Sequence, residues 1–427
     1  MISGPTPSTR RHRLPTLVAA VLLTPLAPAS PAHAATVPCP KPAVAPPAGR
    51  PARPTPPVDD PVLRAVGGDA LATDGLVVPS GSPGPPALTA TSWLVADLDT
   101  GEVLGGCGPH VYGTPASVQK LLLVATVMPK LDPKRVITIT QGDVDIDPGS
   151  SAVGLVRGGK YPVSTLWLGL LLNSGNDAAQ TLARLGGGKG GVAQTLADMN
   201  AKAHELGAYQ THAVTPSGLD GPGQFTSAYD LALIAREAFA EPDFGTYALT
   251  RTAHMPAQKS LKVGAFQIQN ENKLIFGYKG ALGGKTGFTQ LARHSYVGGA
   301  QRDGRRLVVT LLGAETAPLR GYQQGEALLD WGFSLPKDAS VGTLVGPAGS
   351  DQAGNATTES ARVGGSPARI PAPSAARAAV NQGRTLGVAA TVAVVLAGTP
   401  LLLLLLQRRR VRRRVRRRTR RRPAYTR

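Results

Sequence analysis

The sequence predicts an α+β domain in which an antiparallel sheet lies beside a helical lobe. Strand-like segments occur near the start of this region, at residues 92–98 and 102–104, and near its end, at residues 294–300 and 307–313. Helix-like segments fill the interval between them. Strands at both ends of a domain can pair when the chain folds back, so we expect one sheet closed from both termini.

Turn residues divide each pair of strand-like segments. Asp99-Thr100-Gly101 separates the first pair, and Asp303-Gly304 separates the second. Aspartate and glycine favour tight hairpin turns because they tolerate the left-handed backbone conformation. Both pairs are therefore predicted to be hairpins.

The helices are predicted from apolar spacing and from the residues that stop them. Residues 117–127 form an apolar helix that Pro129 ends. Residues 166–172 and 178–185 suggest two helices around a short loop, and residues 227–239 are amphipathic.

The basic charge of the chain is concentrated at its two ends. The 427 residues include 46 Lys and Arg against 27 Asp and Glu, for a net charge of +19. Residues 408–427 hold thirteen Arg and residues 1–34 hold three, with no acid in either segment. The rest is nearly neutral, and aromatic residues make up only 4%. These features argue against a nucleic-acid-binding domain, and no metal-ligating motif or cofactor is predicted.

The first 34 residues have the pattern of an export signal. Arg10, Arg11 and Arg13 precede the apolar run Leu14–Leu26, and Ala32-His33-Ala34 offers small residues at a cleavage point. A buried helix is disfavoured by the prolines of this segment. Whether export uses the general or the twin-arginine route stays open.

A membrane-spanning helix is predicted over residues 385–407, because residues 386–406 carry no charge and are long enough to cross the hydrocarbon core. The arginine triplets of residues 408–427 then form a cytoplasmic tail. A nucleic-acid-binding tail is the alternative. We expect a single-pass protein of the cell membrane with its catalytic domain outside the cytoplasm.

Two segments poor in large apolar residues flank the predicted domain. Residues 35–87 form a proline-rich arm, with ten prolines between residues 38 and 61, and residues 336–384 form a flexible stalk. The catalytic domain is expected at residues 88–335. Cys39 and Cys107 are expected to form a disulfide in an exported protein, with thiol catalysis as the competing interpretation.

Ser117-Val-Gln-Lys120 opens a predicted helix after Pro115-Ala116. Residues three apart share one helical face, so the Lys120 amine can reach the Ser117 hydroxyl. A serine becomes nucleophilic when a base takes its proton, and a lysine can do so if its pKa is lowered. A helix N-cap followed by an exposed lysine is the alternative.

Two further motifs could contribute to the same site as Ser117 and Lys120. Ser174-Gly175-Asn176 lies between two predicted helices, where a hydroxyl and an amide can face a cleft, although turn chemistry alone explains these residue types. Lys285-Thr286-Gly287 follows two glycines. If it starts an edge strand, Lys285 and Thr286 can bind a carboxylate, and Gly287 lets a substrate approach the backbone.

Together the three motifs resemble those of penicillin-recognising serine enzymes. The wider sequence resembles the D-alanyl-D-alanine carboxypeptidases, or low-molecular-mass penicillin-binding proteins. The resemblance spans residues 91–333 and rests on six stretches: Thr114–Lys120, Leu170–Ala179, Thr215–Asp220, Thr226–Leu231, Gly284–Thr289 and Trp331–Phe333. It implies the fold shared by β-lactamases and transpeptidases.

The resemblance also implies roles for individual residues. Ser117 would be the acylated nucleophile, Lys120 its base, and Ser174 and Asn176 the remainder of the proton network. The substrate carboxylate would bind Lys285 and Thr286, with Arg320 in support, and the amides of Ser117 and Phe288 would form the oxyanion hole. Gly287 would admit the substrate.

The implied reaction removes the terminal D-Ala from peptidoglycan stem peptides that end in D-Ala-D-Ala, and β-lactam antibiotics would acylate Ser117 as covalent inhibitors. A D,D-endopeptidase acting on crosslinks, a β-lactamase and a non-catalytic cell-wall-binding protein remain alternatives. A class A β-lactamase is disfavoured because Gly175 stands where that class has Asp. The stalk is too poor in apolar residues to form the extra β-rich domain that many relatives carry.

Overall fold

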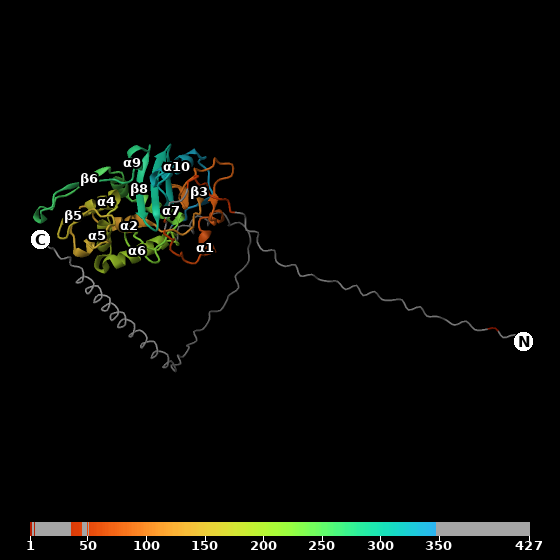
Figure 1. Ribbon diagram of the computed structural model, residues 1–427, viewed down its shortest axis with the longest axis horizontal. Coiled ribbons are helices and arrows are strands. Elements are labelled where there is room, and N and C mark those ends of the chain that lie inside the picture. Colours follow the sequence, from red (N-terminus) through yellow and green to blue (C-terminus); the bar gives the residue numbers. More distant parts are fainter. Residues whose placement is uncertain (2–3, 5–35, 45–48, 50, 347–427) are drawn as a thin grey trace, which may run out of the picture. The chain divides into compact units, whose positions relative to one another are not determined.

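A computed structural model describes residues 1, 4, 36–44, 49 and 51–346. These residues form an α+β domain around a seven-stranded antiparallel sheet with helices on both faces (Figure 1). The strand order is β1-β3-β2-β10-β9-β8, and β11 also pairs with β3. The main strands are β2 (Ser92–Asp97), β3 (Glu102–Cys107), β8 (Ala281–Thr289), β9 (Arg293–Arg302) and β10 (Arg305–Ala314).

The sheet is closed from both ends of the domain, as the sequence predicts. β2, from the start of the domain, pairs antiparallel with β10, from its end, with Val95 opposite Val309. Both predicted hairpins are confirmed. Asp97 accepts hydrogen bonds from the backbone N–H groups of Asp99 and Thr100 in the first turn. Asp303 and Gly304 have φ values of 48° and 78° in the second turn, as a tight hairpin requires.

The helices between the strands also agree with the predicted ones, with shifted ends. The apolar segment after Pro115 begins as the 3₁₀ turn η2 (Ala116–Gln119) and continues as α2. The α-helices are α1 (Pro61–Arg64), α2 (Lys120–Val127), α3 (Gln141–Val144), α4 (Val163–Leu172), α5 (Asn176–Gly186), α6 (Gly191–Glu205), α7 (Ala228–Ala240), α8 (Pro242–Ala248), α9 (Leu274–Gly277) and α10 (Gly321–Ser334).

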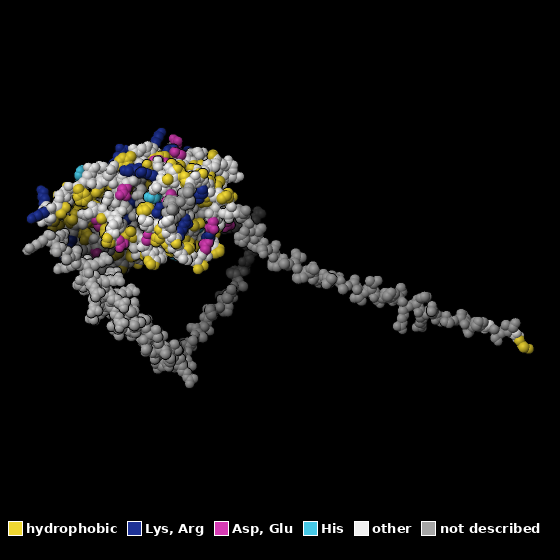
Figure 2. Space-filling model, viewed as in Figure 1, with side chains coloured by type: hydrophobic (Ala, Val, Ile, Leu, Met, Phe, Trp, Pro, Cys, Tyr) yellow, Lys and Arg dark blue, Asp and Glu magenta, His cyan; other side chains and the backbone are white. Residues whose placement is uncertain are grey.

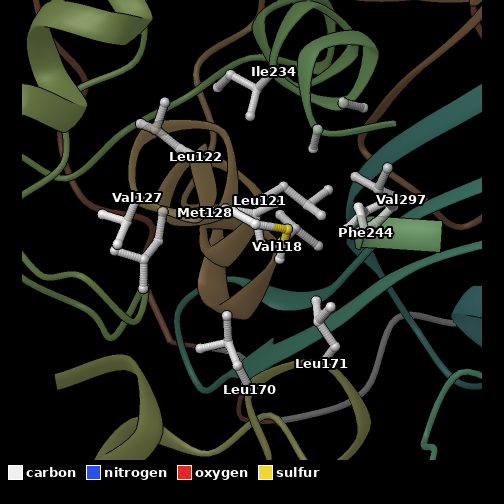
Figure 3. Close-up of a cluster of buried hydrophobic side chains, with 14 of the residues drawn as sticks. Val118, Leu121, Leu122, Val127, Met128, Leu170, Leu171, Ile234, Phe244 and Val297 are labelled. Atoms are coloured by element: carbon white, nitrogen blue, oxygen red, sulfur yellow. The ribbon is translucent and has the colours of Figure 1, made fainter. Parts of the chain in front are cut away.

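The α2 helix lies at the centre of the helical lobe. All eight of its residues are buried, which explains why its sequence is apolar on every side. Its side chains pack with those of α4, α7 and α8, including Leu170, Ile234 and Phe244 (Figure 3). Because this core fixes α2 from all directions, the residues at its N-terminus are held rigidly.

The opposite face of the sheet is covered by α10. Leu328, Leu329 and Trp331 of this helix are buried against the sheet, and the indole of Trp331 meets that of Trp93 edge to face with ring centroids 5.9 Å apart. The sheet is thus buried on both sides, which accounts for the continuous apolar run of β2.

Short secondary elements complete the domain. The strands β4 (Val136–Thr138) and β5 (Lys160–Pro162) pair with each other, as do β6 (Thr252–Met255) and β7 (Phe266–Gln269). The β6–β7 hairpin projects from the helical lobe near the end of the molecule that contains β5 (Figure 1). The remaining 3₁₀ turns are η1 (Asp69–Leu71), η3 (Met128–Lys130), η4 (Gly188–Gly190) and η5 (Lys259–Leu261).

The domain is wider than the predicted limits of residues 88 and 335. β1 (Leu76–Val77), from the predicted arm, and β11 (Gly342–Thr343), from the predicted stalk, both pair with β3. Leu71 and Leu344 are buried. The sequence does not reveal these additions because two-residue strands have no periodic pattern and are held by backbone hydrogen bonds.

The arm is fastened to the domain near its start. Cys39 and Cys107 form a disulfide between the arm and β3. The Leu76 and Leu88 N–H groups donate to the carbonyls of Val37 and Pro40, respectively. Polyproline composition therefore does not keep this segment away from the folded domain, because its carbonyls still accept hydrogen bonds.

Several predicted segments lie outside the described residues: nearly all of the export signal (1–34), most of the stalk, the membrane helix (385–407) and the arginine-rich tail (408–427). Within the described part of the chain, no helix has both the length and the apolar character needed to span a bilayer. Basic and acidic side chains are interspersed on the face shown in Figure 2.

Candidate active site

The site is built where the start of α2, the loop between α4 and α5, and the edge strand β8 come together. Ser117 lies in η2 and Lys120 begins α2. A 3₁₀ turn places residues i and i+3 directly above one another. The Lys120 Nζ accordingly lies 2.8 Å from the Ser117 Oγ, as the Ser-x-x-Lys spacing predicts.

The residue before the nucleophile has an unfavourable backbone conformation. Ala116 has a φ of 50°, in the left-handed region that alanine rarely adopts. The surrounding chain holds it there: the Ser295 hydroxyl on β9 donates a 2.5 Å hydrogen bond to the Pro115 carbonyl. The position of Ser117 is thus set by the sheet as well as by its own helix.

Lys120 is completely buried and has three hydrogen-bond partners. Besides Ser117, its amine donates to the Asn176 Oδ1 at 2.8 Å and to the Ser217 carbonyl at 2.9 Å. Burial lowers the pKa of Lys120 well below its ordinary value, and the positive charge of Lys285 lowers it further. A neutral amine can accept a proton, so this environment suits a base.

The loop that carries Ser174 and Asn176 is held by backbone bonds. Ser174 is buried and has a φ of 58°, and the Asn176 N–H donates to the Ser151 carbonyl. The neighbouring Asp177 accepts hydrogen bonds from the N–H groups of Val153 and Leu155. A second loop therefore covers and stiffens the first.

The β8 strand lies at the edge of the sheet and pairs with β9 alone among the described strands. Lys285 is buried, and its amine donates to the Thr286 carbonyl at 2.7 Å. Burial lowers the pKa of Lys285 to about 8, while the charge of Glu271 acts in the opposite direction. The motif thus lies on an edge strand, in the middle of β8 and not at its start.

At Gly287 the β8 strand passes close to the nucleophile. A methyl group at this position would overlap the Ser295 hydroxyl and would lie 2.9 Å from the Ser117 amide nitrogen. Glycine is required here by close packing. The next residue, Phe288, is exposed, and its ring lies tilted against that of His294 with centroids 4.6 Å apart.

Arg320 does not belong to the hydrogen-bonded group around Lys120. Its side chain is exposed at the start of α10. The following residue, Gly321, lies beside His294 and Tyr296, which pair with Phe288 and Thr286 across the β8–β9 ladder. The fold thus places Arg320 near the same end of β8.

Sequence reasoning missed three contributors to the site. The Ser217 carbonyl binds Lys120, and its loop is fixed because the Gln119 side chain donates to the Thr215 carbonyl. Asp177 supports the covering loop, and Glu271 acts electrostatically on both lysines. The Ser217 carbonyl could not be predicted, because any residue type supplies a backbone carbonyl. Asp177 could have been, because an aspartate in the first turn of a predicted helix is a recognisable signal.

Two other features of the sequence lie outside the site. The glycine-rich segment 186–191 forms a turn between α5 and α6. His110 is buried, and its ring nitrogens bond to the Gln210 side chain and the Val66 carbonyl, so it has a structural role.

Comparisons with known proteins agree with this geometry. The family model described as D-alanyl-D-alanine carboxypeptidase matches residues 80–316. A D-alanyl-D-alanine carboxypeptidase of Mycobacterium tuberculosis is 43% identical over 276 residues, which cover 64% of this chain and 91% of the relative.

Solved structures match the same region. The crystal structure of a D-alanyl-D-alanine carboxypeptidase from M. tuberculosis H37Rv superposes with a TM-score of 0.58 at 42% identity, covering 63% of this chain and all of that one. The Streptomyces K15 DD-transpeptidase superposes with a TM-score of 0.56 at 26% identity, covering 59% of this chain and all of its own. From its fold, its three motifs and these matches, the chain belongs to the D-alanyl-D-alanine carboxypeptidase family of serine peptidases.

Proposed function

We propose that this protein is a serine-type D-alanyl-D-alanine carboxypeptidase that removes the terminal D-Ala from peptidoglycan stem peptides through an acyl-enzyme. The observation that carries the proposal is the buried amine of Lys120 at 2.8 Å from the Ser117 hydroxyl. A lysine with a lowered pKa beside a serine is the arrangement that nucleophilic catalysis needs.

In the acylation step, neutral Lys120 accepts the Ser117 proton while Oγ attacks the carbonyl carbon of the penultimate D-Ala. The amides of Ser117 and Phe288 donate to the developing oxyanion. The carbon–nitrogen bond then breaks, and the proton passes through Ser174 to the leaving amine of D-Ala. Asn176 holds the Lys120 amine in line. Water hydrolyses the acyl-enzyme and restores Ser117.

The free carboxylate of the substrate binds at β8. Charged Lys285 and the Thr286 hydroxyl receive it, Gly287 leaves room for it, and Arg320 reinforces the positive potential from the start of α10. β-Lactam antibiotics present a similar carboxylate and a reactive carbonyl. They acylate Ser117, and the resulting acyl-enzyme is hydrolysed slowly.

Product analysis tests this proposal. Purified full-length protein is incubated with a pentapeptide ending in D-Ala-D-Ala, and the products are weighed. We expect the loss of one alanine, with no release by Ser117→Ala; unchanged release by that variant would overturn the proposal. Cleavage of crosslinked dimers would indicate an endopeptidase, and fast turnover of a chromogenic cephalosporin would indicate a β-lactamase. A wild type that labelled penicillin does not modify would indicate a binding protein.

The location of the enzyme forms a second part of the proposal. The charge-free segment and arginine-rich tail of the sequence support a catalytic domain held outside the cytoplasm by a helix at residues 385–407. Removal of residues 385–427 should move the protein from the membrane fraction to the medium or periplasm. Retention in the membrane would contradict it.

A further inference from the structure

A loop outside the three motifs contacts both sides of the proposed active site. It consists of residues 214–220 and is part of the connection between α6 and α7. The Ser217 carbonyl accepts a hydrogen bond from the Lys120 amine at 2.9 Å. Further along the loop, the Asp220 carboxylate accepts a 2.7 Å hydrogen bond from the hydroxyl of Thr289, the last residue of β8. The loop therefore joins the base at the start of α2 to the edge strand.

The middle of this loop packs against the residue that precedes the nucleophile. Gly218 has a φ of 85°, and a methyl group on it would overlap the Ala116 carbonyl oxygen and lie 3.1 Å from the Gln119 side chain. The loop backbone thus lies directly against η2, where only glycine fits. A shift of the loop would displace Ser117 as well as the Lys120 amine.

The loop is folded around the side chain of Gln224, which is 1% exposed. The Gln224 Oε1 atom accepts hydrogen bonds from the N–H groups of Val214 at 3.1 Å and Thr215 at 3.0 Å. The amide nitrogen of the same side chain donates to the Leu219 carbonyl. One carboxamide therefore binds the backbone of the loop on both sides of Ser217.

A second buried carboxamide joins Gln224 to the turn that carries the nucleophile. Gln119, the third residue of the Ser-x-x-Lys motif, is 2% exposed. Its Nε2 atom donates to the Gln224 Oε1 atom at 3.2 Å and to the Thr215 carbonyl at 2.6 Å. Buried donors and acceptors that are bonded in this way favour one arrangement, because a shift would leave them unpaired.

Resting on the proposed function, we infer that Gln224 is a positioning residue for the acylation step, which it supports through Gln119 and the loop of residues 214–220. Its side chain holds the Ser217 carbonyl against the Lys120 amine, so that the amine stays directed at the Ser117 hydroxyl. General-base catalysis depends on this alignment, since the proton is transferred over a hydrogen-bond distance.

The same loop supports the oxyanion hole but not the binding of the substrate carboxylate. Through Asp220 it fixes Thr289, the residue after Phe288, whose amide donates to the developing oxyanion in the proposed reaction. Lys285 and Thr286 are held instead by pairing of β8 with β9. Loss of the Gln224 side chain should therefore slow acylation and leave the affinity for a carboxylate ligand in place.

The kinetics of acylation of the full-length protein by labelled penicillin test this inference, because they separate the affinity for penicillin from the rate constant at saturation. Gln224→Met keeps the approximate volume of the side chain and removes its hydrogen-bonding groups. The rate constant should fall at least about tenfold, since a displacement of about 1 Å at a catalytic centre can cost about a hundredfold. The affinity should equal that of the wild type.

Gln258→Met is the matched control. Gln258 is also buried, and its side chain bonds to the N–H and the carbonyl of Lys160 at 2.8 and 3.0 Å, but it lies in the segment that joins β6 to β7. This variant should unfold at a lower temperature and keep the wild-type rate constant. An equal loss of rate in the control, an unchanged rate in Gln224→Met, or a loss of affinity alone would overturn the inference.

A double variant tests whether the two carboxamides act through the same loop. Gln119→Met should also slow acylation, and the loss in the double variant should be smaller than the product of the two single losses. Independent losses would contradict the proposed route through Gln119. If Gln224→Met does not fold, Gln119→Met is measured against the same control. A wild type that penicillin does not acylate would instead contradict the proposed function.

Discussion

The Nζ atom of Lys120 lies 2.8 Å from the Oδ1 atom of Asn176, although 56 positions separate the two residues in the chain. Because the amide is neutral, it orients the amine while favouring its charged form much less than a carboxylate would. A carboxylate of the same shape would stabilise the ammonium ion instead.

Asn176→Asp should therefore raise the pKa of Lys120 and slow acylation at neutral pH. An opposite charge at this range shifts a pKa by about 1–3 units, so we expect at least a tenfold loss at pH 7 that is partly recovered at pH 9. The rate of acylation by labelled penicillin is the measurement. A rate reduced equally at both pH values would show that orientation, not charge, is affected.

Gly287→Ala should disable the nucleophile while the domain stays folded. The added methyl group would overlap the Ser295 hydroxyl and crowd the Ser117 amide, which displaces the oxyanion hole. A displacement of about 1 Å at a catalytic centre can cost a hundredfold in rate, and we expect a loss of that order in acylation.

Gly264→Ala provides the control, because a methyl group at residue 264 would meet no atom within 4 Å. Acylation and thermal unfolding of both variants are compared with the wild type. Normal acylation in Gly287→Ala would mean that the strand does not approach the nucleophile as described.

Substrate binding should weaken above pH 8. The pKa of Lys285 is about 8, so its amine is charged below this value and becomes neutral as the pH rises through it. The KM for a D-Ala-D-Ala peptide should rise between pH 8 and pH 9.5. A constant KM over this range would show that carboxylate binding does not depend on the charge of Lys285.

Removal of the Cys39–Cys107 disulfide should lower stability with little effect on acylation. The bond joins residues 68 positions apart, and the loop-closure entropy of such a crosslink corresponds to about 4 kcal/mol as an upper figure. The Cys39→Ser, Cys107→Ser double variant should unfold at a lower temperature, as measured by circular dichroism. An unchanged midpoint would show that backbone bonds alone fasten the arm.

Much of the fold is predictable from local sequence. The turn at Asp303-Gly304 requires left-handed backbone angles that few residues accept, so its identity reveals the hairpin. Pro129 stops the helix that begins at Lys120 because it cannot continue the backbone hydrogen-bond ladder. The edges of the domain are not predictable in this way, since β1 and β11 depend on the free backbone groups of β3.

The chemistry of the site follows the same division. The sequence by itself determined the reactive groups: the Ser117–Lys120 spacing, the Ser174 and Asn176 pair, and Lys285 on a glycine-rich strand. Only the tertiary structure decided the electrostatic setting in which they lie, with Lys120 buried between Asn176 and the Ser217 carbonyl and with the charge of Lys285 acting on it. The physical reason is that a pKa depends on burial and on charges brought near through folding, neither of which is encoded in the spacing of a motif.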